Sequence, residues 1–315
     1  MKINNIVFMG TPEFAVPSLK ALSETKYKPK LCITQPDRPK GRSRKLKPSP
    51  VKTIAEKYQI PLIQPENVNS PTVISSLKEI APEIIITVAY GSFLKKEFRR
   101  LPIYGCLNLH PSLLPKFRGS APINYALFNG DKITGNTIFK IIAKMDAGPI
   151  MSQTEIEIKP NDCYTSLSKK LAEKGALDII KTLQKMEETE LKTYDQDQTK
   201  ATYSHKLLKK DFLLNWQDTA DNIRNRVRGL AESPGITAAF REKRIKIIEV
   251  ELLKSTSKKL PGSIINVNKH GIRIATQDED ILIKKVQPAG KKIMTAYAFS
   301  MGARIRSEDC FTDGF

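Results

Sequence analysis

Residues 105–119 read Gly-Cys-Leu-Asn-Leu-His-Pro-Ser-Leu-Leu-Pro-Lys-Phe-Arg-Gly. A short apolar run opens this stretch, and a polar loop with proline and glycine follows it. Side chains two positions apart on an extended strand point to the same face, so we expect Asn108 and His110 to face one cleft. The rest of the fold is predicted to support this strand end.

The first half of the chain alternates apolar runs of strand length with helical patterns. Continuous apolar runs separated by helices predict a parallel sheet that is covered on both faces. Ligands of such sheets bind beyond the carboxyl ends of the strands, which is where Asn108 and His110 lie. The expected fold class is therefore α/β, with a doubly wound, mostly parallel sheet. Strands are expected at residues 5–9, 30–34, 61–64, 84–89 and 106–109, and helices at 51–58 and 71–80.

A glycine turn, Gly10-Thr11-Pro12, follows the first expected strand. Such a turn is typical of doubly wound folds that bind phosphate groups. The dinucleotide pattern Gly-x-Gly-x-x-Gly is missing, however, and we therefore exclude NAD as a cofactor.

The pattern of apolar residues is different in the second half of the chain. A long amphipathic helix from 163 to about 186 is expected to close the first domain, and hydrophobic periodicity then fades until about residue 208. Short strands with frequent turn signals follow, and they predict a small barrel or sandwich, with the oligonucleotide-binding (OB) barrel as one form that fits the charge. The predicted domains are a catalytic domain at 1–187, a linker at 188–208 and a β-barrel domain at 209–315. Further elements are expected as a helix at 120–129 and as strands at 137–142, 154–158, 236–240, 244–250, 263–267, 271–275 and 281–286.

Charge and cysteine usage restrict the partners and the compartment. The chain has 52 Lys and Arg against 33 Asp and Glu, a net charge of +19, which favours a polyanionic partner unless the whole proteome is lysine-rich. Its 4 cysteines are far apart and form no Cys-x-x-Cys pair, so neither a metal site nor a disulfide scaffold is expected. No apolar run has the length of a signal or a membrane span. We expect a cytoplasmic protein without a membrane partner, with an organelle matrix as the alternative.

The segment 35–52 concentrates positive charge against a single acid, Asp37. Its prolines and Gly41 are predicted to keep it out of helix and strand. A charge run is usually a solvated face, but this segment follows the carboxyl end of an expected strand and so shares the side of the sheet that carries the cleft. A cationic loop in that place suits a phosphate backbone. The predicted contacts are Arg38, Lys40, Arg42, Arg44, Lys45 and Lys47.

The strand end at Asn108 and His110 has the residue types for direct acyl transfer. A lone histidine is more often structural than catalytic, but an amide donor beside it can stabilise a tetrahedral oxyanion while the imidazole stabilises charge or moves protons. The sequence shows no nucleophile elbow and no cysteine in a suitable context for a covalent route. Asp146 is the predicted acidic partner of His110, with a purely turn-forming aspartate as the alternative. Together with the basic segment, this predicts an acyl acceptor carried by a nucleic acid.

At these positions the chain resembles the methionyl-tRNA formyltransferase family. The Asn-x-His and Ser-Leu-Leu-Pro pieces alone mark the wider group of enzymes that use 10-formyltetrahydrofolate. The basic segment and the second domain are what point to the tRNA enzyme. The matching segments, in order along nearly the whole chain, are 8–14, 35–39 with its basic continuation, 88–91, 108–115, 118–123, 146–148 and 288–292.

The resemblance implies transfer of a formyl group from 10-formyltetrahydrofolate to the α-amino group of methionyl initiator tRNA, in translation initiation and without a metal. It implies catalytic roles for Asn108, His110 and Asp146. It also implies that the basic segment around Arg42 enters the acceptor arm and that the C-terminal barrel holds the tRNA. We expect a monomer. The implied folate-binding residues are Ser112, Leu113, Leu114, Pro115 and Tyr90.

Some positions depart from the family pattern, and other functions remain open at this stage. Ser43 stands where the family commonly has glycine, Lys144 takes the place of a small residue, and residues 298–315 match poorly, so no role is assigned to them. One alternative function is formyl transfer to a small amine or hydrolysis of the formyl-folate. The other is a non-catalytic RNA-binding protein on an enzyme fold.

Overall fold

The computed structural model describes residues 2–39, 46–189, 192–306 and 308–314. The chain forms two compact units, which are described separately. Unit 1 comprises residues 1–122, 133–157 and 168–204, and unit 2 comprises residues 123–132, 158–167 and 205–315. Within the described ranges, no helix is both long enough and apolar enough to cross a membrane.

Unit 1 is built on a mostly parallel sheet, which confirms the predicted α/β class. Neighbouring strands from β7 to β5 run parallel, while β9 is antiparallel to β7 and β10 is antiparallel to β9. From edge to edge the sheet contains β10 (Ile150–Glu157), β9 (Ile133–Lys140), β7 (Cys106–His110), β6 (Ile84–Val88), β1 (Ile6–Gly10), β2 (Leu31–Ile33) and β5 (Leu62–Ile63).

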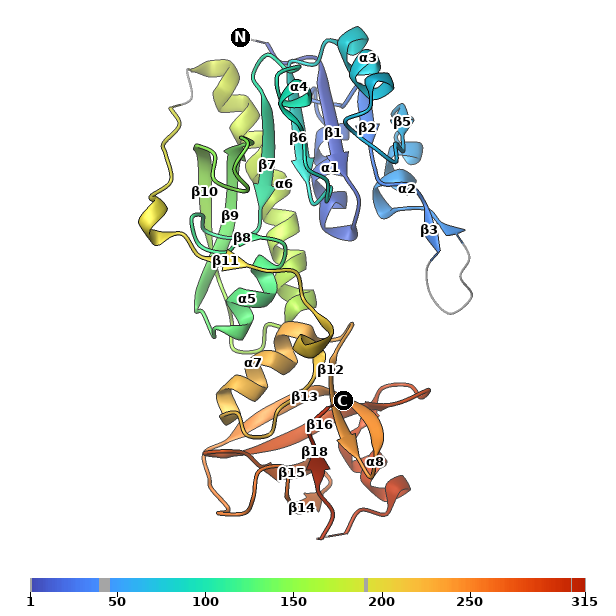
Figure 1. Cartoon of the computed structure of the whole chain (residues 1–315), viewed down its shortest axis with the longest axis vertical. Helices are drawn as coiled ribbons and strands as arrows, with labels where there is room; N and C mark the ends of the chain where they lie inside the picture. The colour runs from blue at the N-terminus through green and yellow to red at the C-terminus, as the bar shows by residue number, and fades with distance from the viewer. Residues whose placement is uncertain (1, 40–45, 190–191, 307, 315) are drawn as a thin grey trace. The chain divides into compact units, whose positions relative to one another are not determined.

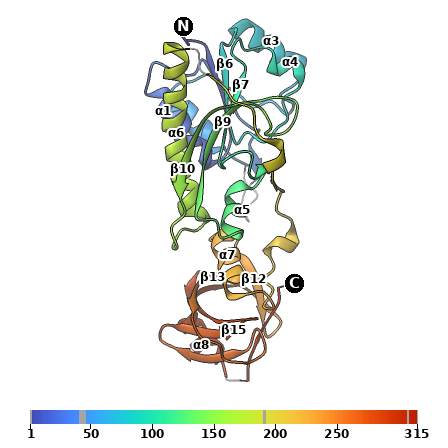
Figure 2. The same cartoon turned by 90° about the vertical axis from the view of Figure 1, so that its left-hand side faces the viewer.

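Helices cover both faces of this sheet, as Figure 2 shows. Side chains alternate across the central strand, so that Ile6 and Phe8 belong to one buried core while Val7 and Met9 belong to another. The first core is closed by α1 (Val16–Ser23), α2 (Pro50–Lys57) and α6 (Tyr164–Glu188), and the second by α3 (Pro71–Ile80) and α4 (Lys96–Arg99). The other elements of unit 1 are η1 (Glu13–Ala15), β3 (Arg38–Pro39), β4 (Leu46–Lys47), β8 (Arg118–Gly119), η2 (Gln198–Lys200) and β11 (Tyr203–Ser204), whereas α5 (Pro122–Phe128) belongs to unit 2 apart from its first residue.

The ends of the basic segment are a correction to the prediction. The sequence predicts that prolines keep it out of regular structure, yet β3 and β4 pair as antiparallel strands with Arg38 opposite Lys47 and Pro39 opposite Leu46. A proline fits a two-residue exposed ribbon because an edge strand does not need its missing N–H. Lys40, Arg42, Arg44 and Lys45 lie outside the described residues.

Unit 2 is a curled antiparallel sheet around its own core, which confirms the predicted barrel type (Figure 1). Its strand order is β14 (Ile264–Asn268), β15 (Gly271–Ala275), β16 (Asp280–Pro288), β13 (Lys243–Leu253), β12 (Ile236–Phe240) and β18 (Phe311–Thr312), and β17 (Met294–Thr295) pairs with β16. An isolated bridge between Ser263 and Cys310 links the two ends of that order. The unit also contains η3 (Lys209–Phe212), α7 (Ala220–Leu230) and α8 (Ala296–Ala303).

The C-terminal residues complete the core of unit 2, although the sequence assigns them no role. Phe311 is buried on β18, which pairs with β12. Its ring lies 5.8 Å from that of Trp216 and 5.1 Å from that of Phe240. The segment therefore supplies an edge strand and an aromatic cluster to the barrel.

Candidate functional site

The strand β7 presents Asn108 and His110 on one face of the sheet. Leu107 and Leu109 face the other way and pack in the core that α6 closes. Cys106 belongs to the opposite core, on the side of α3 and α4. Residues two apart share a face, so Asn108 and His110 point the same way, as the sequence predicts, and the structure shows that this is the face opposite α6.

His110 is 4% exposed, and both of its ring nitrogens have a defined environment. Nε2 lies 2.9 Å from the carbonyl oxygen of Phe117. A carbonyl oxygen only accepts, so Nε2 must carry the proton and donate it. In the neutral ring Nδ1 is then the acceptor nitrogen, and it lies 3.7 Å from Oδ2 of Asp146.

Asp146 comes from the loop between β9 and β10. Because β9 is antiparallel to β7, it ends beside Leu107, and the loop must fold back to reach His110. Asp146 has φ +47°, a left-handed conformation that aspartate tolerates better than most residues. Its Oδ2 accepts a 2.8 Å hydrogen bond from the backbone N–H of Gly119. The carboxylate is thus fixed by the backbone and placed beside the imidazole.

Asn108 is half-buried and sits opposite Phe139 on β9 and Thr87 on β6. Within the described part of the chain, its side-chain amide makes no hydrogen bond to a protein group. An amide in that position keeps both donors for a ligand. The structure therefore brings the three predicted catalytic residues to one edge of the sheet.

The segment that carries Ser112, Leu113, Leu114 and Pro115 is tied to the antiparallel strands. The hydroxyl of Thr137 on β9 accepts a hydrogen bond from the N–H of Leu114 at 3.1 Å and donates one to the carbonyl of Ser112 at 2.6 Å. Ser112 and Leu114 are buried, whereas Leu113 and Pro115 are half-buried. Leu113 and Pro115 are therefore better placed to touch a ligand, and the predicted folate contacts stay a prediction.

Tyr90 follows β6 at the same edge of the sheet. Its hydroxyl is buried and has no hydrogen-bond partner in the described chain. Burial raises the pKa of the hydroxyl to about 12. The carbonyl of Tyr90 accepts a hydrogen bond from Gln35 at 3.2 Å. A buried phenol without a partner is costly unless a ligand supplies one, so this residue remains a candidate for the cofactor.

The described ends of the basic segment are exposed. Arg38 forms an ion pair with Glu66 at 2.8 Å, and both side chains are largely in solvent. Lys47 is exposed as well. The carboxylate of Asp37 is engaged by Lys52 at 2.7 Å, and this hydrogen bond lowers the pKa of Asp37. Lys52 is therefore occupied within the protein, while Arg38 and Lys47 point to the surface.

Sequence reasoning missed a group of polar residues behind Asp146. Arg118 is fully buried, and its guanidinium donates to the side-chain oxygens of Gln196 and Gln198. Lys144 donates to the same Gln198 oxygen at 3.2 Å. Arg118 lies in a segment that carries the family resemblance, so a signal existed for it. Gln196 and Gln198 lie in the predicted linker, where no local pattern marks them.

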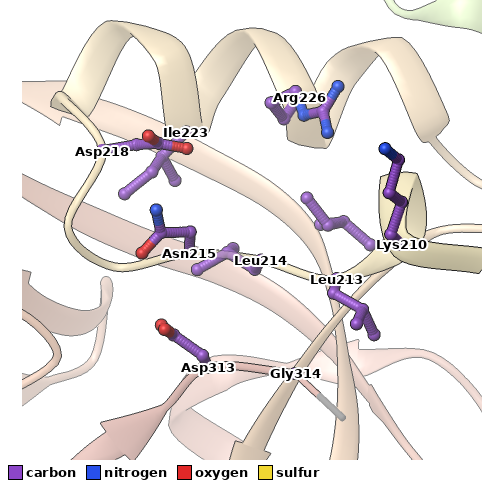
Figure 3. A pocket seen from close by; sticks show the side chains of 10 residues that line it. Lys210, Leu213, Leu214, Asn215, Asp218, Ile223, Arg226, Asp313 and Gly314 are labelled. Atoms are coloured by element: carbon purple, nitrogen blue, oxygen red, sulfur yellow. The ribbon is translucent and has the colours of Figure 1, made fainter.

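A pocket of about 360 Å³ lies within unit 2, away from the residues described above (Figure 3). Leu213, Leu214 and Ile223 line it, with Lys210 on the right of the view and Asp218 on the left. None of the predicted site residues that the structure describes lines this pocket. Among the described residues there is also no cluster of three or more His, Cys, Asp or Glu that could hold a metal ion. The candidate active site is therefore the edge of the sheet at Asn108, His110 and Asp146.

Solved structures with a similar fold have low sequence identity to this chain. An N-formyltransferase from Helicobacter canadensis, solved with folinic acid and dTDP-3-aminofucose, has a TM-score of 0.67 at 19% identity over 91% of this chain and all of its own. HypX from Aquifex aeolicus, solved with tetrahydrofolic acid, has a TM-score of 0.63 at 15% identity over 95% of this chain and 47% of its own. These likenesses confirm the fold.

Comparison of sequences identifies the family more specifically than the likeness of folds does. Residues 1–183 match the family described as Formyl transferase, and residues 206–304 match the Formyl transferase, C-terminal domain. The methionyl-tRNA formyltransferase of Thermodesulfovibrio yellowstonii is 44% identical over 96% of this chain and 97% of its own. Those of Kosmotoga olearia and Bacillus subtilis are 43% and 38% identical, over 95% and 98% of this chain and 97% of their own. The chain belongs to the methionyl-tRNA formyltransferase family.

Proposed function

We propose that this protein transfers the formyl group of 10-formyltetrahydrofolate to the α-amino group of methionine on initiator tRNA. The observation that carries the proposal is the convergence at the end of β7. Nδ1 of His110 faces the Asp146 carboxylate at 3.7 Å, and the Asn108 amide on the same strand face has no hydrogen-bond partner among the described residues. A hydrogen-bond donor and a proton acceptor at one strand end are what direct acyl transfer requires.

In the first step the neutral methionyl amine attacks the formyl carbon. The new C–N bond converts the formyl oxygen into an oxyanion, which the Asn108 amide stabilises as a donor. The amine proton passes to Nδ1 of His110, because Nε2 is already committed to the Phe117 carbonyl. The carboxylate of Asp146 stabilises the imidazolium that forms.

In the second step the tetrahedral intermediate collapses. The carbonyl re-forms, the bond between the formyl carbon and N10 of the folate breaks, and the proton held at His110 moves to the departing nitrogen. Asp146 assists by holding the imidazole in one orientation, which its hydrogen bond from Gly119 makes possible. The products are formylmethionyl-tRNA and tetrahydrofolate, and neither a metal nor a covalent enzyme intermediate takes part.

The formyl-folate is proposed to lie along the segment that Thr137 fixes, in contact with Leu113 and Pro115 rather than with the buried Ser112 and Leu114 side chains. The unpartnered hydroxyl of Tyr90 supports a contact there. The tRNA is proposed to contact Arg38, Lys47 and the rest of the basic segment, and the barrel formed by residues 209–315. We further propose that the protein acts as a cytoplasmic monomer, and its 4 free cysteines suit a reducing compartment.

Formyl transfer to different acceptors tests this function directly. We expect the protein to formylate methionyl initiator tRNA in the presence of 10-formyltetrahydrofolate, and to formylate methionyl elongator tRNA and free small amines much more slowly. Radioactive formyl donor incorporated into acid-precipitable tRNA measures the rate. Formylation of only a small amine would overturn the proposal, and loss of formate from the folate without any acceptor would favour a hydrolase.

Asn108→Ala should lower kcat by roughly 10²–10³ if the amide is an oxyanion donor. Since that amide makes no protein hydrogen bond in the described chain, the melting temperature should change little. Asn108→Asp is the matched variant, because it keeps the size of the side chain and removes the donor, and it should lose a similar factor. Near-normal turnover in both variants would remove Asn108 from the mechanism.

Removal of the positive charges at Arg38 and Lys47 should weaken tRNA binding and flatten its dependence on salt. Each phosphate contact contributes about 0.7–0.9 to the slope of log affinity against log salt, so Arg38→Ala with Lys47→Ala should lower the slope by about 1–2. Fluorescence anisotropy of labelled tRNA at several salt concentrations gives the slope. Lys181→Ala with Lys185→Ala, two exposed positions on α6, is the control. Equal slopes in the two double variants would mean that the basic segment does not contact the phosphates.

A further inference from the structure

The segment 194–204 runs beside the active-site loops and joins unit 1 along its length. The backbones of Tyr194 and Ile150 are paired, and β11 pairs with β8. The N–H of Phe117 donates to the hydroxyl of Thr202 at 2.9 Å. This stretch of the predicted linker is therefore bound to the loops that carry Phe117, Gly119 and Asp146.

Gln196 sits at the centre of these contacts and is 6% exposed. Its Oε1 accepts from Nε of Arg118 at 3.0 Å and from Nη2 at 2.7 Å. Its Nε2 donates to the carbonyl of Asp146 at 2.9 Å and to that of Gly148 at 2.8 Å. Because a guanidinium only donates and a carbonyl only accepts, the orientation of this amide is fixed. All four hydrogen-bonding positions of the amide are used.

The guanidinium of Arg118 is buried without a carboxylate partner among the described residues. Its partners there are the neutral amide oxygens of Gln196 and Gln198. A hydrogen bond from a charged donor is stronger than a neutral one, and it polarises the amide that receives it, which makes Nε2 of Gln196 a better donor. The buried charge of Arg118 thus strengthens the hydrogen bonds that Gln196 donates to the carbonyls of Asp146 and Gly148.

The backbone of the turn at residues 146–148 is stabilised by contacts from outside the turn. Asp146 has φ +47°, a left-handed conformation that costs an aspartate less than most residues but is still less favourable than the ordinary helical and extended regions. A Cβ at Gly148 would overlap the carbonyl oxygen of Lys140, so the turn is also pressed against β9. The two hydrogen bonds from Gln196 contact the turn at both ends, at the carbonyls of residues 146 and 148. They fix the backbone from which the carboxylate reaches His110.

We propose that Gln196 is a positioning residue for the reaction, which acts by holding the turn of Asp146 so that its carboxylate stays beside Nδ1 of His110. It touches neither substrate nor reacting atoms. Arg118 is the buried anchor that fixes and polarises its amide. The inference rests on the proposed function only through the role of Asp146, and it names a residue outside the segments that carry the family resemblance.

The test compares substitutions at two glutamines of the same segment. Gln196→Leu should lower kcat by about 10–100-fold, because a small misplacement of a catalytic group is enough for such a loss, while KM for folate and for tRNA should stay within about threefold. Gln198→Leu is the matched control. Gln198→Leu also removes an acceptor of Arg118 and the hydrogen bond from Nε2 of Gln198 to the carbonyl of Gln196. It leaves both hydrogen bonds from Gln196 to the carbonyls of Asp146 and Gly148 in place, so it should lower kcat clearly less than Gln196→Leu does.

A double-mutant cycle with Asp146→Ala separates positioning from general damage. If Gln196 acts through the carboxylate, Gln196→Leu should change kcat by less than about twofold once the carboxylate is gone. An equal loss with and without Asp146, or a normal kcat for Gln196→Leu, would overturn the proposal. The cycle is measured with whichever acceptor the unsubstituted protein formylates, so that failure on tRNA would count against the proposed function alone.

Gln196→Glu keeps the inference testable if the leucine variant does not fold. A glutamate keeps the size of the side chain and the acceptor for Arg118. It replaces the NH₂ donor with a carboxylate oxygen, which faces the carbonyls of Asp146 and Gly148 without a hydrogen bond. We expect a folded protein, judged by its melting temperature, with kcat lowered at least as much as in Gln196→Leu. Normal turnover in this variant would show that the contact with Arg118 is sufficient and that the hold on the turn is not needed.

Discussion

The hydrogen bond from the backbone N–H of Gly119 to the carboxylate of Asp146 is the interaction on which the site depends. It joins two loops that leave β7 and β9 at opposite ends, and it fixes the carboxylate at 2.8 Å from a rigid donor. Gly119 has φ +114°, and a Cβ there would overlap the carbonyl oxygen of Ser204. The position therefore requires glycine, because the backbone of Ser204 on β11 lies directly against it.

The polar interior behind the site explains how a charged residue can be fully buried. Arg118 has no carboxylate beside it in the described chain, and isolated buried charges are costly. Here three hydrogen bonds to two glutamine oxygens replace solvent. Lys144, a departure from the family pattern, shares the oxygen of Gln198 and stays at the surface. The lysine at position 144 therefore hydrogen-bonds to an oxygen that Arg118 already uses, and its own charge stays in solvent.

Local signals in the sequence predict much of the fold. The α3 helix is found at its predicted bounds because Ser70 caps its first turn and Pro71 fits the first helical position. The strand β7 and the shared face of Asn108 and His110 follow from periodicity. What local patterns could not predict are contacts between distant parts of the chain. The bonds between Arg118 and Gln196 join residues 78 positions apart, and Phe311 reaches β12 from the far end of the chain.

The proposed reaction requires that His110 keeps its proton on Nε2 and presents Nδ1 to Asp146. Nitrogen-15 NMR of labelled histidine tests it directly, since the chain has 3 histidines and His205 and His270 are exposed and can be replaced by glutamine for assignment. We expect neutral His110 to have its proton on Nε2 and none on Nδ1. A neutral His110 with its proton on Nδ1 would contradict the proposed proton transfer through Nδ1.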